Sequence, residues 1–191
     1  TKECDNISDC PIEFDNLRKV YGDFVAVNDL NLKIKKNSFT GFLGPNGAGK
    51  TTVFNMLSGV YKPTEGMITF IGRDGKLQVT SGKSPANLCR IGIARTFQNI
   101  RLFGNLTVAE NIKIALHQSR KVNPLHVLFR TPLFHKDEKF MEEKAEYLLS
   151  LFHMESKKNE LAKNLPYGEQ RKLEICRALA SNPKLLLLDE P

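Results

Sequence analysis

The chain has 191 residues, of which 41% are hydrophobic and 26% charged, a balance that is ordinary for a globular protein and argues against disorder. Lysine and arginine number 28 against 21 acidic residues, and the resulting charge of +7 is compatible with nucleic acid, nucleotide phosphates or an anionic membrane surface without selecting one. The longest aliphatic run, Leu185 to Leu188, is far shorter than the roughly 20 apolar residues of a membrane-spanning helix. No segment has the pattern of a secretory signal, so we expect no membrane span and no export.

The cysteines and the two ends of the chain give further expectations. Cys4, Cys10, Cys89 and Cys176 form no CxxC pair and have no histidines at zinc-finger spacing, so we expect reduced thiols in a cytosolic protein. The chain starts at a threonine and stops directly after an apolar strand pattern. We therefore expect a fragment that is truncated at its C-terminus.

The first half of the chain is predicted to be rich in strands. Short strands are expected at residues 12–14 and 30–34, and a buried strand at residues 39–43 runs into a glycine-rich loop. A helix follows over residues 50–58 and is closed by a glycine. Further strands are expected at residues 67–71 and 91–97, separated by a surface excursion over residues 72–89.

The second half is predicted to be a helical insertion that returns to the sheet. Thr107 and Glu110 have capping-box spacing at the start of one helix. Amphipathic patterns predict two more helices, over residues 136–152 and 168–180. Residues 185–188 then read as a central parallel strand buried on both faces. This order predicts an α/β fold, with a mixed sheet over residues 11–98 and 183–191 and a helical subdomain over residues 99–182.

The loop at residues 44–51 matches the pattern G-x-x-x-x-G-K-[ST] and lies between a predicted strand and a predicted helix. Its glycines let backbone N–H groups wrap a phosphate, and the following helix points its partial positive end at the same anion. Lys50 supplies a cation for the β- and γ-phosphates, and the Thr51 hydroxyl is placed to bind Mg²⁺. The residues of this predicted phosphate loop are Gly44, Pro45, Asn46, Gly47, Ala48, Gly49, Lys50 and Thr51.

Two acidic residues follow the apolar run at the end of the chain. Asp189 emerges at the carboxyl end of the predicted strand, where open α/β sheets bind ligands, and would hold the water shell of Mg²⁺. Glu190 is then positioned to polarise an attacking water as general base. Together with the phosphate loop, these residues predict a P-loop nucleotide hydrolase.

Four stretches in this order resemble the nucleotide-binding subunits of ATP-binding cassette (ABC) transporters. The chain is most similar to the ATP-binding subunits of bacterial branched-chain amino acid importers. The stretches that carry this resemblance are residues 44–52, Thr96-Phe97-Gln98, residues 165–171 and residues 185–191; the importer resemblance adds residues 95–103 and 128–132.

The resemblance implies further site residues. Tyr21 is similar to the aromatic residue that stacks on adenine, and Thr52 completes the phosphate loop. Gln98 resembles the glutamine that binds Mg²⁺ and joins the two lobes. Tyr167, Gly168 and Glu169 resemble the signature sequence, whose helix N-terminus contacts the γ-phosphate of a nucleotide held by a second subunit.

This chain departs from the family pattern in two places. The usual signature has a serine where this chain has Pro166, and proline offers neither a hydroxyl nor an N–H group to a phosphate. All four histidines precede Glu190, so none is placed as the γ-phosphate-sensing histidine of the family. We therefore expect the fragment to bind nucleotide better than it hydrolyses it.

The resemblance implies a function and its partners. We expect an ATP- and Mg²⁺-dependent motor subunit of an importer, peripheral on the cytoplasmic face of the membrane. It would pair with a second ATP-binding subunit and with transmembrane permease subunits, and would bind no nucleic acid. The basic stretch Lys113 to Lys136 would face the permease or anionic lipid, or would be a solvated face.

Three alternatives remain at this point. A non-transport ABC ATPase would usually show tandem cassettes, coiled-coil arms or zinc-binding cysteine pairs, and none is visible. A GTPase would need an Asn-Lys-x-Asp motif, and no asparagine here is followed by lysine. A nucleotide-binding module without turnover stays open for this chain. The transported solute is set by partner subunits, and branched-chain amino acids are indicated by the subfamily resemblance alone.

Overall fold

The computed structural model describes residues 9–96, 100–119 and 132–189 of the chain. It divides into two compact units, Thr1–Ile93 and Ala94–Pro191. The predicted site residues Gln98 and Glu190 lie outside the described residues.

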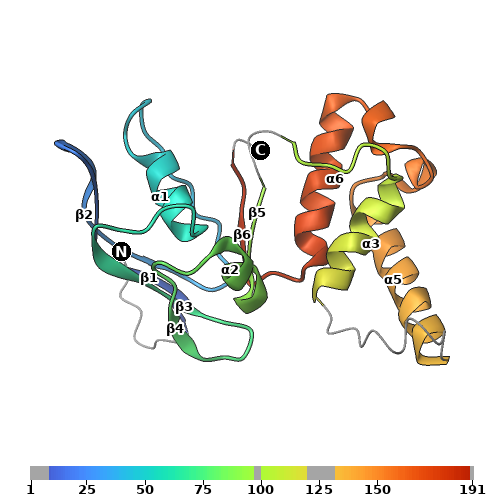
Figure 1. Cartoon of the computed structure of the whole chain (residues 1–191), viewed down its shortest axis with the longest axis horizontal. Helices are drawn as coiled ribbons and strands as arrows, with labels where there is room; N and C mark the ends of the chain where they lie inside the picture. The colour runs from blue at the N-terminus through green and yellow to red at the C-terminus, as the bar shows by residue number, and fades with distance from the viewer. Residues whose placement is uncertain (1–8, 97–99, 120–131, 190–191) are drawn as a thin grey trace. The chain divides into compact units, whose positions relative to one another are not determined.

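The first unit is built on a four-stranded antiparallel sheet with the strand order β2-β1-β3-β4 (Figure 1). Ile12 and Phe14 of β1 pair with Ile34 and Leu32 of β2 and are almost fully buried. Their spacing of two residues places them on the same face of the sheet, which is why this face forms the core. The strands are β1 (Ile12–Tyr21), β2 (Phe24–Ile34), β3 (Glu65–Ile71) and β4 (Leu77–Val79).

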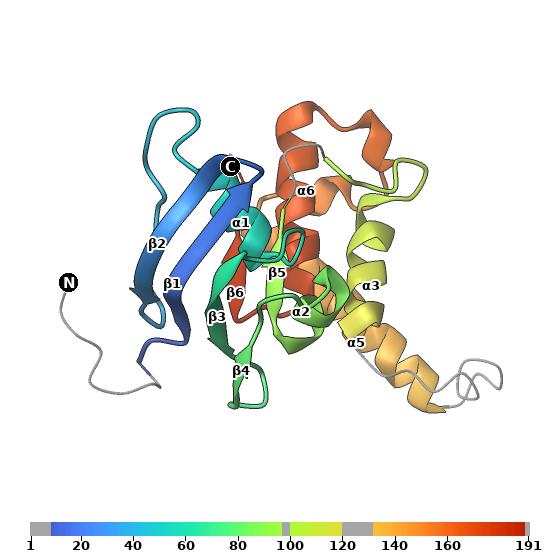
Figure 2. The ribbon, with the colours of Figure 1, turned by 60° about the vertical axis from the view of Figure 1, so that its left-hand side comes forward.

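Two helices complete this unit, α1 (Lys50–Leu57) and α2 (Pro85–Ile91) (Figure 2). Helix α1 contacts β2 and buries Val53, Met56 and Leu57, so its apolar stripe faces the core. It ends as predicted, because Gly59 adopts φ 73° directly after the last turn. Helix α2 begins after Ser84, whose side chain accepts a hydrogen bond from the backbone N–H of Asn87.

The structure corrects several boundaries in this unit. Strands β1 and β2 are much longer than predicted because they form one hairpin, and the surface excursion contains β4 and α2. The buried strand expected at residues 39–43 is absent, and Phe39 and Leu43 are fully exposed. A strand needs a neighbour to satisfy its backbone, and none of the strands of this unit pairs with this segment. Instead, Thr40 to Leu43 line a pocket of about 500 Å³ together with Ala26, Leu30, Val53 and others.

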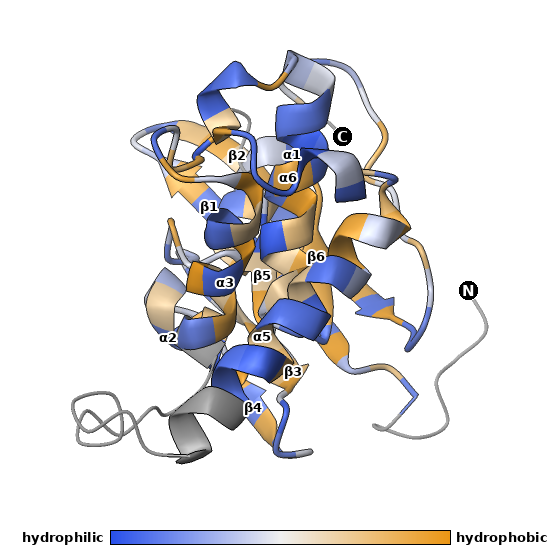
Figure 3. Ribbon diagram, turned by 90° about the vertical axis from the view of Figure 1, so that its right-hand side faces the viewer, coloured by the Kyte–Doolittle hydropathy of each residue, from blue (hydrophilic) through white to orange (hydrophobic). Residues whose placement is uncertain are grey.

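The second unit contains a helical core made of α3 (Val108–Ser119), α5 (Pro132–Leu151) and α6 (Tyr167–Ala180). The three helices pack against one another around Ile112, Ala145 and Leu173, all fully buried. Two short 3-10 helices, η1 (Glu155–Lys157) and η2 (Ala162–Asn164), connect α5 to α6. The solvent side of α5 is mostly hydrophilic, which gives the helix its amphipathic pattern (Figure 3).

The predicted helix starts are largely confirmed here. Glu110 accepts hydrogen bonds from the backbone N–H of Thr107 at 2.7 Å and from its hydroxyl at 2.9 Å, and Thr107 accepts one from the Glu110 backbone N–H at 3.2 Å. This is the expected capping box. Helix α5 begins four residues earlier than predicted, and α6 begins one residue earlier.

The second unit also holds a pair of strands, β5 (Ile93–Arg95, its first residue in the other unit) and β6 (Leu185–Leu187). Thr96 donates its backbone N–H to the carbonyl of Leu187 at 3.0 Å. Within the described residues β6 pairs with β5 alone, and Leu185 and Leu186 are only half-buried. The expectation of a central strand buried on both faces is not met, because β6 has a described neighbour along one edge only and its half-buried leucines show that its faces are incompletely covered.

The cysteines differ from expectation at one position. Cys10 is disulfide-bonded, whereas Cys89 and Cys176 are free. The absence of a CxxC pair does not exclude a disulfide, because the bond depends on how the fold brings two sulfurs together. No helix among the described residues is long and apolar enough to cross a membrane.

Candidate functional site

The predicted phosphate loop connects the exposed segment at residues 39–43 to α1. The Ala48 backbone N–H donates to the Pro45 carbonyl at 3.2 Å, which closes a tight turn. Gly47 and Gly49 adopt φ 84° and 82°, a left-handed conformation that other residues rarely adopt. A Cβ atom on Gly49 would also lie 2.5 Å from the carbonyl oxygen of Ala26 in β2. The second glycine of the motif is therefore fixed by backbone conformation and by close packing.

Lys50 is the first residue of α1, and its ammonium group folds back over the loop. Its Nζ donates to the carbonyl of Gly44 at 2.6 Å and to that of Pro45 at 2.8 Å. Gly49 is the N-cap and provides no side-chain cap, so the N–H groups of the first turn have no partner inside the helix. The hydroxyls of Thr51 and Thr52 belong to the same turn. This arrangement combines a fixed cation with a helix N-terminus, the usual elements of a phosphate site.

Tyr21 ends β1 and reaches the same helix. Its hydroxyl is close enough to the side chain of Thr52, the residue that follows the phosphate loop, for Thr52 to lower the pKa of Tyr21. The Tyr61 ring lies edge-on to the Tyr21 ring, with the two centroids 5.7 Å apart. The Lys19 ammonium lies 5.0 Å from the centroid of the Tyr21 ring. Partial burial and, to a lesser degree, the neighbouring Tyr61 raise the pKa of Tyr21, while the side chain of Thr52 opposes that shift. The side chain is 41% exposed, so ring surface is available to a base.

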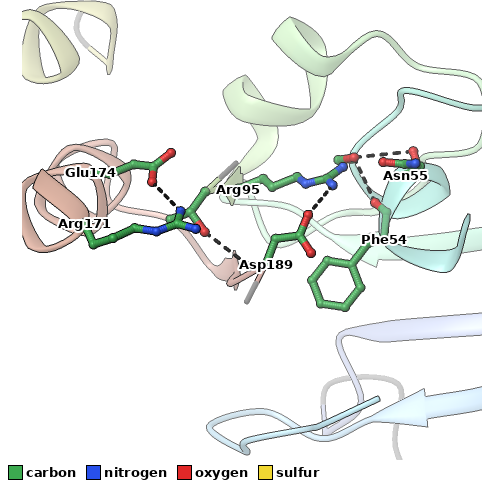
Figure 4. A network of polar contacts seen from close by, with 8 residues as sticks. Phe54, Asn55, Arg95, Arg171, Glu174 and Asp189 are labelled. Atoms are coloured by element: carbon green, nitrogen blue, oxygen red, sulfur yellow. Dashed lines mark hydrogen bonds and ion pairs between the residues drawn. The ribbon is translucent and has the colours of Figure 1, made fainter. Parts of the chain in front are cut away.

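Asp189 follows β6 in the second unit and is held from β5. Its Oδ2 accepts a hydrogen bond from Nη2 of Arg95 at 2.7 Å, and its backbone N–H donates to the Thr96 hydroxyl at 3.3 Å (Figure 4). The same view shows the ion pair of Arg171 with Glu174, at 3.0 Å. Asp189 is thus anchored by its side chain and by its backbone.

The predicted signature residues form the start of α6. Pro166 is the N-cap without a side-chain cap, and its carbonyl accepts the N–H groups of Glu169 and Gln170. Tyr167 is 66% exposed, and a Cβ on Gly168 would meet nothing within 4 Å. Glu169 pairs with Lys157 at 3.0 Å, which raises the pKa of that lysine. The helix start is accessible, as a contact with a second molecule would require.

The predicted site residues therefore gather into three places. Tyr21 and the phosphate loop lie together in the first unit, whereas Asp189 and the start of α6 belong to the second. Gln98, Glu190 and residues 120–131 of the basic stretch are outside the described residues.

Sequence reasoning missed four residues that contact the predicted ones. Arg95 and Thr96 hold Asp189, and Lys19 and Tyr61 flank Tyr21. Arg95 and Thr96 stand in stretches that carry the family resemblance, and Lys19 lies two residues before Tyr21 on a strand and so on the same face, but no role in the site was predicted for them.

The residues present fit a nucleotide with a hard cation. In the first unit, the loop presents the Lys50 ammonium and the N–H groups at the start of α1 to a phosphate, and Thr51 offers a hydroxyl oxygen of the kind that Mg²⁺ prefers. In the second unit, Asp189 offers a carboxylate. In the part of the chain that the structure describes, no three His, Cys, Asp or Glu residues gather into a metal cluster.

A glycine-rich phosphate loop opening a helix, with a carboxylate at a strand end, defines a P-loop nucleotide-binding protein. The family model described as "ABC transporter" matches residues 27–191. The chain belongs to the ABC transporter family, and its fold is that of the ABC ATPase domain.

Two relatives are ATP-binding proteins of high-affinity branched-chain amino acid transport. BraF of Pseudomonas aeruginosa is 41% identical over 180 residues, covering 94% of this chain and 69% of BraF. LivG of Escherichia coli K12 is 42% identical over 171 residues, covering 90% of this chain and 65% of LivG. The chain thus spans about two thirds of the length of the curated relatives it matches.

Solved structures agree with this assignment. The ADP conformation of MJ1267, an ATP-binding cassette of an ABC transporter, matches with a TM-score of 0.73 and 32% identity, covering 93% of this chain and 67% of that one. A dimeric post-hydrolysis state of the ATP-binding cassette MJ0796, bound to ADP and Pi, matches with a TM-score of 0.72 and 28% identity, covering 94% of this chain and 74% of that one.

Proposed function

We propose that this chain is the ATP-binding and ATP-hydrolysing part of a motor subunit of an ABC importer for branched-chain amino acids. The single observation that carries ATP binding is the phosphate loop, with Lys50 at the N-terminus of α1 and its ammonium group folded over the loop. The identity of 41% to BraF over 94% of the chain supports the transport role and the solute class.

Each residue has a role in this proposal. The backbone of residues 44–52 binds the phosphates, Lys50 neutralises their charge, and Tyr21 stacks on adenine through its exposed ring face. Thr51, Gln98 and Asp189 hold Mg²⁺, which supplies charge neutralisation of the phosphate oxygens. Glu190 takes the proton of the attacking water.

The organisation of the chain is part of the proposal. We infer one ABC nucleotide-binding domain, with a sheet core over residues 11–98 and 183–191 and a helical subdomain over residues 99–182. The shared apolar core of α3, α5 and α6 supports the helical part, and the pairing of β5 with β6 supports the core boundaries.

The partners follow from the family. A second ATP-binding subunit would receive Tyr167, Gly168 and Glu169 at its nucleotide, and the dimeric MJ0796 structure supports such pairing. Transmembrane permease subunits would hold the protein peripherally on the cytoplasmic face of the membrane. Nucleic acid has no role in this proposal.

The test of the proposal is nucleotide binding by Lys50→Ala. Removing a cation that makes charge-assisted hydrogen bonds to phosphate should weaken a fluorescent ATP analogue by at least about tenfold. Lys36→Ala, which removes an exposed lysine after β2, should bind like the unchanged chain. Equal affinity of all three proteins would remove Lys50 from the site and overturn the proposal.

A nucleotide-binding module without turnover is the second candidate, because the chain spans about two thirds of BraF. Phosphate release from ATP by this chain, compared with the same chain carrying Glu190→Gln, separates the two. Turnover that Glu190→Gln abolishes supports hydrolysis, whereas ATP binding with no turnover by either protein supports the module.

A further inference from the structure

Asp189 is attached to β5 at two points. Nη2 of Arg95 lies 2.7 Å from Oδ2 of Asp189, and the Asp189 backbone N–H lies 3.3 Å from the Thr96 hydroxyl (Figure 4). The hydrogen bond of Thr96 with Leu187 of β6 sets the register that brings these groups together. The Arg95 side chain is 9% exposed and the Asp189 side chain 20%, so water screens this pair poorly.

We propose that Arg95 is a positioning residue that holds Asp189 through Oδ2 and weakens, through its charge, the pull of this carboxylate on a divalent cation. The inference rests on the proposed function, since it concerns the same Mg²⁺–nucleotide site. It adds a residue that the phosphate-loop pattern and the acidic strand end do not contain.

The geometry divides the two oxygens of the carboxylate between two tasks. Oδ2 is taken by the guanidinium at 2.7 Å, and we assign Oδ1, for which no contact is recorded among the described residues, to a cation or its bound water. Arginine stays protonated at any working pH, so this counter-charge is permanent. A carboxylate held in this way has a fixed orientation before the nucleotide arrives.

The charge of Arg95 acts in two directions. It compensates Asp189 in the metal-free chain, where an unpaired, largely buried carboxylate would be costly. It also repels a divalent cation that approaches the same carboxylate, because the two positive charges share one partner. Asp189 would therefore hold a divalent cation less tightly than an aspartate without this counter-charge would.

The experiment separates charge from packing. Mn²⁺ is titrated into the chain in the presence of saturating ADP, and free Mn²⁺ is measured by electron paramagnetic resonance. Arg95→Gln keeps a hydrogen-bond donor and removes the charge, and it should tighten Mn²⁺ binding by about three- to tenfold. Arg95→Lys keeps the charge and should stay within about twofold of the unchanged chain.

Two controls isolate the pair. Lys113→Gln removes the same charge from the ion pair of Lys113 with Glu142, which joins α3 to α5, and should leave Mn²⁺ binding unchanged. In an Asp189→Asn background, Arg95→Gln should no longer shift Mn²⁺ binding, because the shared partner has gone.

Arg95→Met is a second neutral variant with a similar side-chain volume and should show the same shift in Mn²⁺ affinity as Arg95→Gln. Urea unfolding shows which variants fold.

The outcomes are distinct. Unchanged or weaker Mn²⁺ binding by folded Arg95→Gln or Arg95→Met would overturn the inference and leave the proposed function intact. Failure of the unchanged chain to bind ADP, with or without Mn²⁺, would overturn the proposed function and this inference with it. A tightening seen with the neutral variants, absent with Arg95→Lys and abolished by Asp189→Asn, supports the inference.

Discussion

At the scale of single residues, Gly49 shows how much one position of the phosphate loop is constrained. Its φ of 82° is strained for any residue with a Cβ, and such an atom would lie 2.5 Å from the carbonyl oxygen of Ala26. Gly47 has a similar φ of 84°, but a methyl group at its Cα would meet nothing within 4 Å. A substitution at Gly47 would therefore test backbone strain alone, whereas one at Gly49 would test backbone strain together with a steric collision.

This difference gives a prediction about stability. Gly47→Ala should lower the free energy of unfolding by about 1–3 kcal/mol through strain alone. Gly49→Ala should cost more, because β2 or the loop must also move away from the new methyl group. Urea unfolding of both variants measures the difference, and equal losses would show that the approach to Ala26 is relaxed at no cost.

At the scale of elements, the capping box before α3 links the start of a helix to pH. Hydrogen bonds from the backbone and hydroxyl of Thr107 lower the pKa of Glu110, with desolvation opposing them and Lys113 adding a smaller effect. A carboxyl group whose pKa is lowered by folding stabilises the folded state above its unfolded pKa. That contribution is lost as the pH falls through the folded pKa.

We therefore expect two results for this helix start. Thr107→Ala should lower the free energy of unfolding by about 1 kcal/mol at neutral pH, and Thr107→Ser should restore it. The difference between the unchanged chain and Glu110→Gln should shrink as the pH falls below the unfolded pKa of about 4.3 and should level off once the pH has passed below the lowered folded pKa, where Glu110 is protonated in both states. Thermal unfolding followed over a range of pH checks both, and a pH-independent difference would contradict the role of Glu110.

Several elements were predictable because their signals are local. The capping box marked the start of α3, and Gly59 marked the end of α1, since caps are read from neighbouring residues. The glycine-rich loop was equally clear. The strand at residues 39–43 was not, because strand formation depends on a partner that can be distant in the sequence. For the same reason the contact of Arg95 with Asp189, 94 residues away, was not predicted, although Arg95 stands in a stretch that carries the importer resemblance.

At the scale of the whole chain, two of the cysteines belong to different units. Cys176 lies fully buried in the helical core, where burial raises the pKa of its thiol to about 12. Cys89 belongs to the first unit and is partly exposed. The two free thiols therefore report on different parts of the molecule.

Thiol labelling should distinguish them. At pH 8, Cys89 should react readily with a maleimide, whereas Cys176 should react at least about a hundredfold more slowly, because the helical core must open first. Mass mapping of the labelled peptides over time measures both rates, and Cys89→Ser serves to confirm the assignment. Comparable rates at the two positions would show that the helical core opens easily.

The fold of Lys50 over its own loop sets what the site will accept. Two of the three protons on its ammonium group are already donated to the carbonyls of Gly44 and Pro45. A ligand that binds Lys50 must therefore replace these neutral oxygens as hydrogen-bond acceptors. When an anion replaces these carbonyl oxygens as the partner of Lys50, a singly charged anion gains little interaction energy. A polyanion gains more, because each of its charged oxygens can accept a hydrogen bond. The hydrogen bonds of Lys50 to its own loop should therefore favour the binding of multiply charged anions such as a triphosphate over singly charged anions such as chloride or acetate.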